Sequence, residues 1–142
     1  MTDILLATDS DALADEVEAA VAGTHLLHRV RAGVDVVPAI GEVDPGLVLL
    51  DLQIGNMGGV AACLAVRQRE EMGDIDERPV LLMLDRDVDV FLANEAHADG
   101  HLIKPVDAFT IMRAVENALA TTADVDDDEA ADSEESQEPS PA

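Results

Sequence analysis

Residues 47–59 read LVLLDLQIGNMGG, in which four apolar residues are followed by an aspartate and then by a loop with three glycines. An uninterrupted apolar run of this length is typical of a strand that is buried on both faces of a parallel sheet. Asp51 therefore stands at the carboxyl end of an expected strand. Similar short apolar runs occur at residues 4–7, 26–30, 80–84 and 102–103.

Stretches with apolar residues at helical spacing separate these five runs. They are marked by Leu13, Val17 and Val21, by Val60, Cys63, Leu64 and Val66, by Phe91, Leu92 and Ala96, and by Phe109, Met112, Val115 and Leu119. Residues 34–40 form a weaker helix pattern because they contain Pro38, but they must also bridge two strands. Strands alternating with helices predict a parallel sheet that is covered on both faces. We expect Phe91, Phe109 and Met112 in the core, and Cys63 and Met57 as packing residues.

The composition excludes several classes of function. The 142 residues include 31 acidic and eight basic ones, for a net charge of −23, which would repel nucleic acid and anionic lipid. The chain has no Trp or Tyr and only two Phe, so it offers little surface for stacking bases. A single cysteine excludes an internal disulfide, and no apolar run reaches the length of a membrane span. We expect a cytoplasmic protein that binds neither nucleic acid nor membrane.

The charge also divides the chain. Residues 122–142 hold nine acidic residues, no basic one and two prolines, with little that could be buried. Such a composition is typical of a disordered segment. We therefore expect one globular domain over residues 1–121 and a disordered acidic tail over residues 122–142.

Charged side chains stand at the carboxyl ends of four of the expected strands. Asp9, Asp51, Asp85 and Lys104 each follow an apolar run, and Lys104 is the only lysine in the chain. Asp11, two residues beyond Asp9, is expected to cap the helix that follows the first run. In open parallel sheets, ligands bind beyond the carboxyl ends of the strands. Clustered carboxylates suit Mg²⁺, and a nearby ammonium suits a metal-bound phosphoryl group. Because no phosphate-binding glycine loop with Lys and Ser/Thr is present, Asp51 is the expected acceptor, as a carboxylate nucleophile.

Three strings, LVLLDLQIGNMGG at 47–59, PVLLMLD at 79–85 and ADGHLIKP at 98–105, resemble the receiver domain of two-component response regulators. The resemblance covers about residues 2–121 and implies a flavodoxin-like (CheY-like) α/β fold with five helices and a five-stranded parallel sheet in the order 2-1-3-4-5. It implies that Asp51 is the phosphoacceptor and that Lys104 contacts the phosphoryl group, with a cis peptide bond before Pro105. It also implies that Mg²⁺ is held by Asp9, Asp51 and the backbone carbonyl of Gln53.

Two strand ends depart from the family pattern. Thr8 stands where the family usually has a first acid, and Asp85 stands at the switch position, where the family has Thr or Ser. An ionised carboxylate at that position accepts hydrogen bonds but donates none. On one hypothesis Asp85 restores the carboxylate count and helps to hold Mg²⁺. On the other it pairs with Lys104 and holds the domain in one state without phosphate.

These features predict a stand-alone receiver, a signalling domain rather than an enzyme, which accepts phosphate on Asp51 from a histidine kinase or a phosphotransfer protein. It would then act on a downstream protein of unknown identity, and helices four and five border a face where receivers bind partners or form homodimers. The alternative is a pseudo-receiver that binds partners constitutively because Thr8 and Asp85 disable the switch. A metal-dependent phosphatase is disfavoured, because Gln53 stands where such an enzyme usually has a second acid.

Overall fold

Five strands form one parallel sheet in the computed structural model, which describes residues 1–128 and the side chains of residues 1–121. The strands are β1 (Asp3–Ala7), β2 (Leu26–Val30), β3 (Leu47–Asp51), β4 (Val80–Leu84) and β5 (Gly100–Ile103). Their order in the sheet is β2-β1-β3-β4-β5, and every neighbouring pair is parallel. The predicted fold class and strand order are confirmed.

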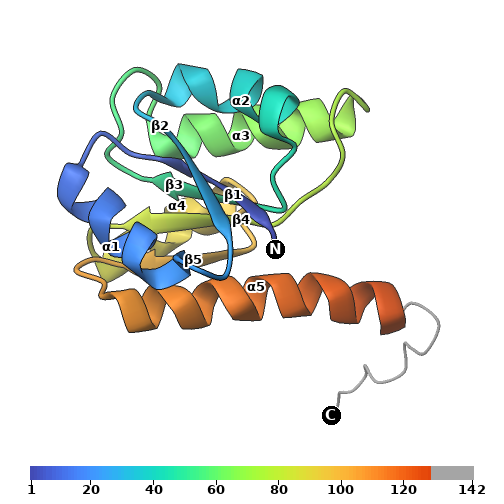
Figure 1. The fold of residues 1–142 in the computed structure, drawn as a ribbon. Coiled ribbons are helices and arrows are strands. Elements are labelled where there is room, and N and C mark those ends of the chain that lie inside the picture. Colours follow the sequence, from blue (N-terminus) through green and yellow to red (C-terminus); the bar gives the residue numbers. More distant parts are fainter. Residues whose placement is uncertain (129–142) are drawn as a thin grey trace, which may run out of the picture.

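Helices connect the strands on both faces of the sheet (Figure 1). They are α1 (Asp11–Val21), α2 (Val36–Val43), α3 (Gly59–Glu71), α4 (Val90–Glu95) and α5 (Ala108–Asp128), with short 3₁₀ turns η1 (Gly33–Asp35) and η2 (Asp87–Asp89) before α2 and α4. Pro38 is compatible with α2 because it is the third residue of that helix, where the backbone N–H would have no partner within the helix.

The cap of α1 differs from the expectation for Asp11. Ser10 is the N-cap, and its Oγ accepts a hydrogen bond from the backbone N–H of Leu13 at 3.1 Å. Asp11 is instead the first residue of the helix, where its carboxylate pairs with Arg29 at 3.0 Å and with Arg31 at 3.2 Å.

Two apolar cores lie on opposite faces of the sheet. One is packed by α2, α3 and α4, and the other by α1 and α5, which also lie side by side in Figure 1. Cys63 is fully buried in the first of these cores, as predicted. Strands β3 and β4 are buried along their whole length, which explains why their sequences are continuous apolar runs.

The register of the sheet brings four strand ends to one edge. Ala7 pairs with Leu50, Asp51 pairs with Met83, and Leu84 pairs with Ile103. The residues that follow these strands are therefore at nearly the same height in the sheet. This register places Thr8, Asp51, Asp85 and Lys104 beside one another.

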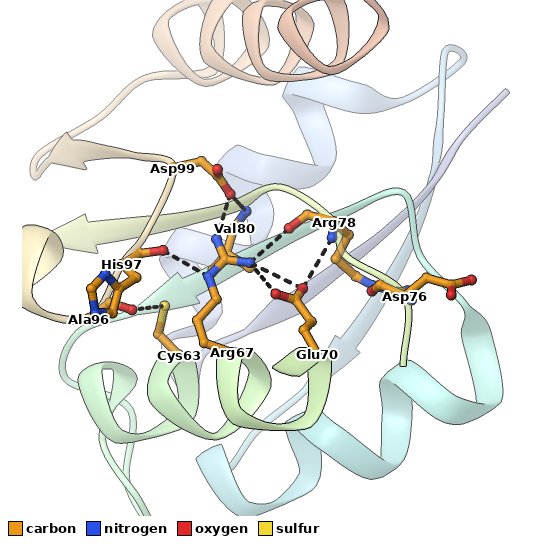
Figure 2. Close-up of polar contacts among 9 residues, drawn as sticks. All are labelled: Cys63, Arg67, Glu70, Asp76, Arg78, Val80, Ala96, His97 and Asp99. Atoms are coloured by element: carbon orange, nitrogen blue, oxygen red, sulfur yellow. Dashed lines mark hydrogen bonds and ion pairs between the residues drawn. The ribbon is translucent and has the colours of Figure 1, made fainter. Parts of the chain in front are cut away.

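At the opposite edge of the sheet, Arg67 joins α3 to the strands and to the end of α4 (Figure 2). Its guanidinium donates hydrogen bonds to the carboxylates of Glu70 and Asp99 and to the backbone carbonyls of Arg78 and His97, at 2.6–3.1 Å. Burial tends to lower the pKa of Arg67, but the hydrogen bonds to Asp99 and Glu70 outweigh it and raise the pKa. The network links α3 to the amino ends of β4 and β5, on the side of the sheet away from the cluster of strand ends.

Four predicted core residues lie at the surface instead. Phe91 is 62% exposed, Phe109 63%, Met57 43% and Met112 38%. Spacing identified the helices but not which apolar residues face the sheet. The buried positions are occupied by Ala93 in α4 and by Ile111 and Val115 in α5.

The last helix runs beyond the predicted domain boundary. Its backbone is helical to Asp128, seven residues past residue 121, and no Gly or Pro interrupts residues 108–128. The predicted boundary at residue 121 thus falls within α5, and the disorder expected from residue 122 stays a prediction. The rest of the predicted tail, residues 129–142, lies outside the described residues. Within the described part of the chain, none of the helices is long and apolar enough to cross a membrane.

Candidate functional site

Asp51, the last residue of β3, is the central residue of the cluster at the strand ends. Asp51 is only 2% exposed, and every described partner of its carboxylate is a hydrogen-bond donor. Its Oδ1 accepts from Lys104 Nζ at 2.5 Å and from the backbone N–H of Gln53 at 3.1 Å. Its Oδ2 accepts from the hydroxyl of Thr8 at 2.6 Å. A carboxylate has about four acceptor positions, so these three donors leave about one of them, on Oδ2, for a further ligand.

Lys104 bridges two carboxylates at this edge. Its Nζ lies 2.5 Å from Oδ1 of Asp51 and 3.1 Å from Oδ1 of Asp85. Burial alone would lower the pKa of this ammonium, but its hydrogen bonds to Asp51 and Asp85 outweigh that effect and raise the pKa. The Lys104–Pro105 peptide bond is cis, as the resemblance implied.

Asp85 is held from two sides. Besides Lys104, the side-chain amide of Gln53 donates to Asp85 Oδ2 at 2.6 Å. Burial tends to raise the pKa of Asp85, but the hydrogen bonds from Gln53 and Lys104 outweigh it and lower the pKa. Asp85 is therefore stabilised as an anion next to the ammonium that Asp51 also uses. These contacts match the hypothesis in which Asp85 pairs with Lys104.

Asp9 reaches the same edge but contacts the loop after β3. Its Oδ2 accepts a long hydrogen bond, 3.4 Å, from the backbone N–H of Gly55. The loop is tied down further where Gly33 N–H donates to the Gly55 carbonyl at 3.1 Å. A Cβ on Gly33 would lie 1.7 Å from the carbonyl oxygen of Met57, so the close approach of η1 to this loop requires glycine.

The oxygen donors at this edge fit Mg²⁺ only as an open site. Within the described part of the chain, no three His, Cys, Asp or Glu residues are grouped so that they could hold a metal ion. Asp9 and the Gln53 carbonyl lie in the segments that adjoin Asp51, and Oδ1 of Asp51 is bound by Lys104 in place of a metal ion. Mg²⁺ commonly takes one or two carboxylates and completes its shell with water and phosphate oxygens. The donor set fits that kind of site and does not fit an all-protein cage.

The structure therefore joins Asp51, Lys104, Asp85 and Gln53 by direct contacts and places Asp9 beside the same loop. Two contacts were not anticipated. The first is the bond from the Thr8 hydroxyl to Asp51, for which the only sequence signal was that Thr8 directly follows the β1 run. The second is the side chain of Gln53 on Asp85, since only the backbone of Gln53 was expected to matter.

Two curated proteins with similar sequences are response regulators. The chain is 30% identical over 111 residues to the transcriptional regulatory protein AfsQ1 of Streptomyces coelicolor, an alignment that covers 75% of this chain and 46% of that protein. It is 30% identical over 141 residues to the sensory transduction protein RegX3 of Mycolicibacterium smegmatis, covering 89% of this chain and 54% of that one. The chain thus spans about half the length of these curated relatives. No protein-family model matches it.

Solved structures agree on the fold. A putative response regulator from Chloroflexus aurantiacus superimposes with a TM-score of 0.75 at 23% identity, covering 84% of this chain and 98% of that one. Fold, strand order and sequence similarity together define a receiver domain of the response regulators of two-component signalling.

Proposed function

We propose that this domain accepts a phosphoryl group on Asp51 in a two-component phosphorelay, that Mg²⁺ is required, and that the domain signals through protein–protein contacts in the cytoplasm. The observation that carries the proposal is the buried Asp51 carboxylate with Lys104 Nζ at 2.5 Å. An anion at the end of a buried strand, with a free acceptor position and a fixed ammonium, is suited to attack phosphorus.

The donor in this proposal is a phosphohistidine on a histidine kinase or a phosphotransfer protein. A lone pair of Asp51 forms the new O–P bond while the P–N bond of the donor breaks and its electron pair returns to the imidazole. Lys104 balances the negative charge that builds up on the phosphoryl oxygens. Asp9, the Gln53 carbonyl and Oδ1 of Asp51, which Lys104 would leave as it turns to the phosphoryl group, would hold Mg²⁺, and the ion would supply charge neutralisation on the phosphoryl group.

A surface for partners is available on the helices next to this edge. Val88 in η2 and Phe91 in α4 are each at least 60% exposed, and Phe109 and Met112 in α5 are also exposed. Helices α4 and α5 both contact the edge strand β5, from opposite faces of the sheet. Large apolar residues exposed along such an edge are typical of an interaction surface. We assign the downstream protein, or a second copy of the chain, to this surface.

Incubation with acetyl phosphate and Mg²⁺ followed by intact-mass measurement tests the proposal. The wild type should gain one phosphate, and Asp51→Asn should gain none. Absence of an adduct on the wild type would contradict the proposal. Steady release of inorganic phosphate with turnover would indicate a phosphatase instead.

A pseudo-receiver is the second candidate, because Lys104 is already shared between Asp51 and Asp85. In that case the ammonium is not available to a phosphoryl group, and the domain binds its partner constitutively. Substituting Asp85→Thr separates the two candidates. A pseudo-receiver gains labelling on Asp51 only in this variant, whereas a phosphorylated receiver is labelled with Asp85 in place.

A further inference from the structure

Thr8 contacts Asp51 directly, a role in the site that its neutral side chain alone would not predict. Its side chain is fully buried at the end of β1, between Asp51 and the start of α1. The backbone N–H of Ser10 donates to Thr8 Oγ1 at 3.0 Å, and Oγ1 lies 2.6 Å from Asp51 Oδ2. Asp51 as an anion can only accept, so the single hydroxyl proton of Thr8 points at Asp51.

This arrangement makes the two oxygens of Asp51 unequal. Oδ1 receives the ammonium of Lys104 and the amide of Gln53, whereas Oδ2 receives only the Thr8 hydroxyl. The terminal torsion of an aspartate is broad, so donors on Oδ1 alone would leave the carboxylate plane free to turn. Donors on both oxygens fix the plane and therefore the direction of the free acceptor position on Oδ2.

We propose that Thr8 is a positioning residue for phosphoryl transfer, which holds Oδ2 of Asp51 in the orientation from which it attacks. This inference rests on the proposed function of Asp51 and adds a role for a residue outside the expected acidic set. Holding a nucleophile in the attack geometry contributes strongly to rate, and a misplacement of about 1 Å can cost about two orders of magnitude.

The neutral side chain also determines how the charge of Asp51 is balanced. With a hydroxyl at position 8, Asp51 faces one ammonium and no second buried carboxylate from β1. A carboxylate at position 8 would lie against Oδ2 and repel it, and a divalent cation would relieve that repulsion. Thr8 therefore adds no further negative charge beside Asp51, where the one ammonium of Lys104 is already shared with Asp85.

A kinetic comparison of three variants tests the positioning role. The rate of phosphate gain is measured by intact mass over a range of acetyl phosphate concentrations at fixed Mg²⁺, for wild type, Thr8→Val, Thr8→Ser and the exposed control Thr24→Val. Thr8→Val should lower the maximal rate by about tenfold to a hundredfold, because it loses a hydrogen bond to a charged group. The half-saturating concentration should stay unchanged because Thr8 touches Asp51 and not the donor.

Thr8→Ser should recover most of the rate, since it keeps the hydroxyl, and Thr24→Val should equal the wild type. A purely structural Thr8 would lower stability in Thr8→Val while leaving the rate per folded molecule unchanged. That result, or a Thr8→Ser variant as slow as Thr8→Val, would overturn the inference while leaving phosphorylation of Asp51 intact.

A second measurement does not need phosphorylation. Thr8→Asp should have a lower Tm than the wild type without Mg²⁺, and added MgCl₂ should raise its Tm more than it raises that of the wild type. Adding Asp51→Asn to Thr8→Asp should abolish both effects, because the repulsion then has no partner. If Thr8→Asp matches the wild type with and without Mg²⁺, Thr8 does not face Asp51 and the inference fails. If the wild type takes up no phosphate but the Tm results hold, the proposed function fails and the role of Thr8 in the transfer fails with it, while the contact between Thr8 and Asp51 stands.

Discussion

Removing the Lys104 ammonium should destabilise the fold, because it leaves Asp51 as a buried anion. Asp51 has 3% of its side chain exposed and Lys104 24%, and their atoms are 2.5 Å apart. Breaking a buried pair by removing one partner typically costs about 3–5 kcal/mol. In Lys104→Met, the hydroxyl of Thr8 and the amide of Gln53 still solvate Asp51. We therefore expect a loss of about 2–3 kcal/mol.

Urea unfolding at pH 7.5, followed by circular dichroism because the chain has no Trp or Tyr, measures this loss. The double variant Asp51→Asn/Lys104→Met should lose less than the sum of its single variants, by about 1–2 kcal/mol, because it buries no unpaired charge. Arg69→Met is the matched control: it breaks a 3.4 Å pair with Asp74 that is about half exposed, and it should cost under about 0.5 kcal/mol. Strict additivity, or a Lys104→Met loss no larger than that of Arg69→Met, would refute the reasoning.

Three further predictions concern pH and the scaffold. The folded-state pKa of Lys104 lies above its ordinary value of 10.5, so the stability that its charge contributes should be complete below about pH 10 and should decline as the pH rises through the folded-state pKa. Urea unfolding between pH 9 and about 11.5 should therefore show a steeper loss of stability in the wild type than in Lys104→Met. Equal slopes would contradict the raised pKa of Lys104. Gly33→Ala should destabilise the fold by about 2 kcal/mol or more, because its Cβ would overlap the Met57 carbonyl. The control Gly41→Ala lies within α2, where the added Cβ meets nothing within 4 Å, and it should stabilise the fold by about 0.5–1 kcal/mol. Thermal melts that rank the two variants in the opposite order would show that the loop after β3 is not held against η1. Arg67→Met should lower the free energy of unfolding in urea by about 3 kcal/mol, because it leaves Glu70 and Asp99 without their shared cation. A loss as small as that of Arg69→Met would show that the network in Figure 2 does not hold α3 to the sheet.

The fold could be predicted from the sequence because the three central strands, β1, β3 and β4, are largely apolar runs that end in a polar residue or are followed by one. Doubly buried strands such as β3 and β4 permit few other patterns, and parallel strands must be joined by crossovers. The same rule predicted that Asp51, Asp85 and Lys104 meet, since the carboxyl ends of neighbouring parallel strands share an edge.

Side-chain direction could not be predicted in the same way. Helical spacing places Phe91 and Phe109 on helices, but whether each faces the sheet depends on how the helix is rotated against it, and the small residue Ala93 packs there instead. The same limit applies to Thr8, whose hydroxyl orientation follows from the backbone N–H of Ser10, a partner that only the fold supplies. Asp11 was expected to cap α1, but the chain turns one residue earlier and Ser10 has that role.

The most direct test of the claim that Asp51 accepts phosphate is to treat the protein with acetyl phosphate, reduce it with borohydride and map its peptides. The reagent converts a phosphorylated aspartate into homoserine and leaves an unmodified aspartate unchanged, so it identifies which carboxylate carried the phosphate. We predict homoserine at residue 51 in the wild type, with Asp9 and Asp85 unmodified. Homoserine at residue 9 or 85, or at no residue, would contradict the assignment of Asp51 as the acceptor.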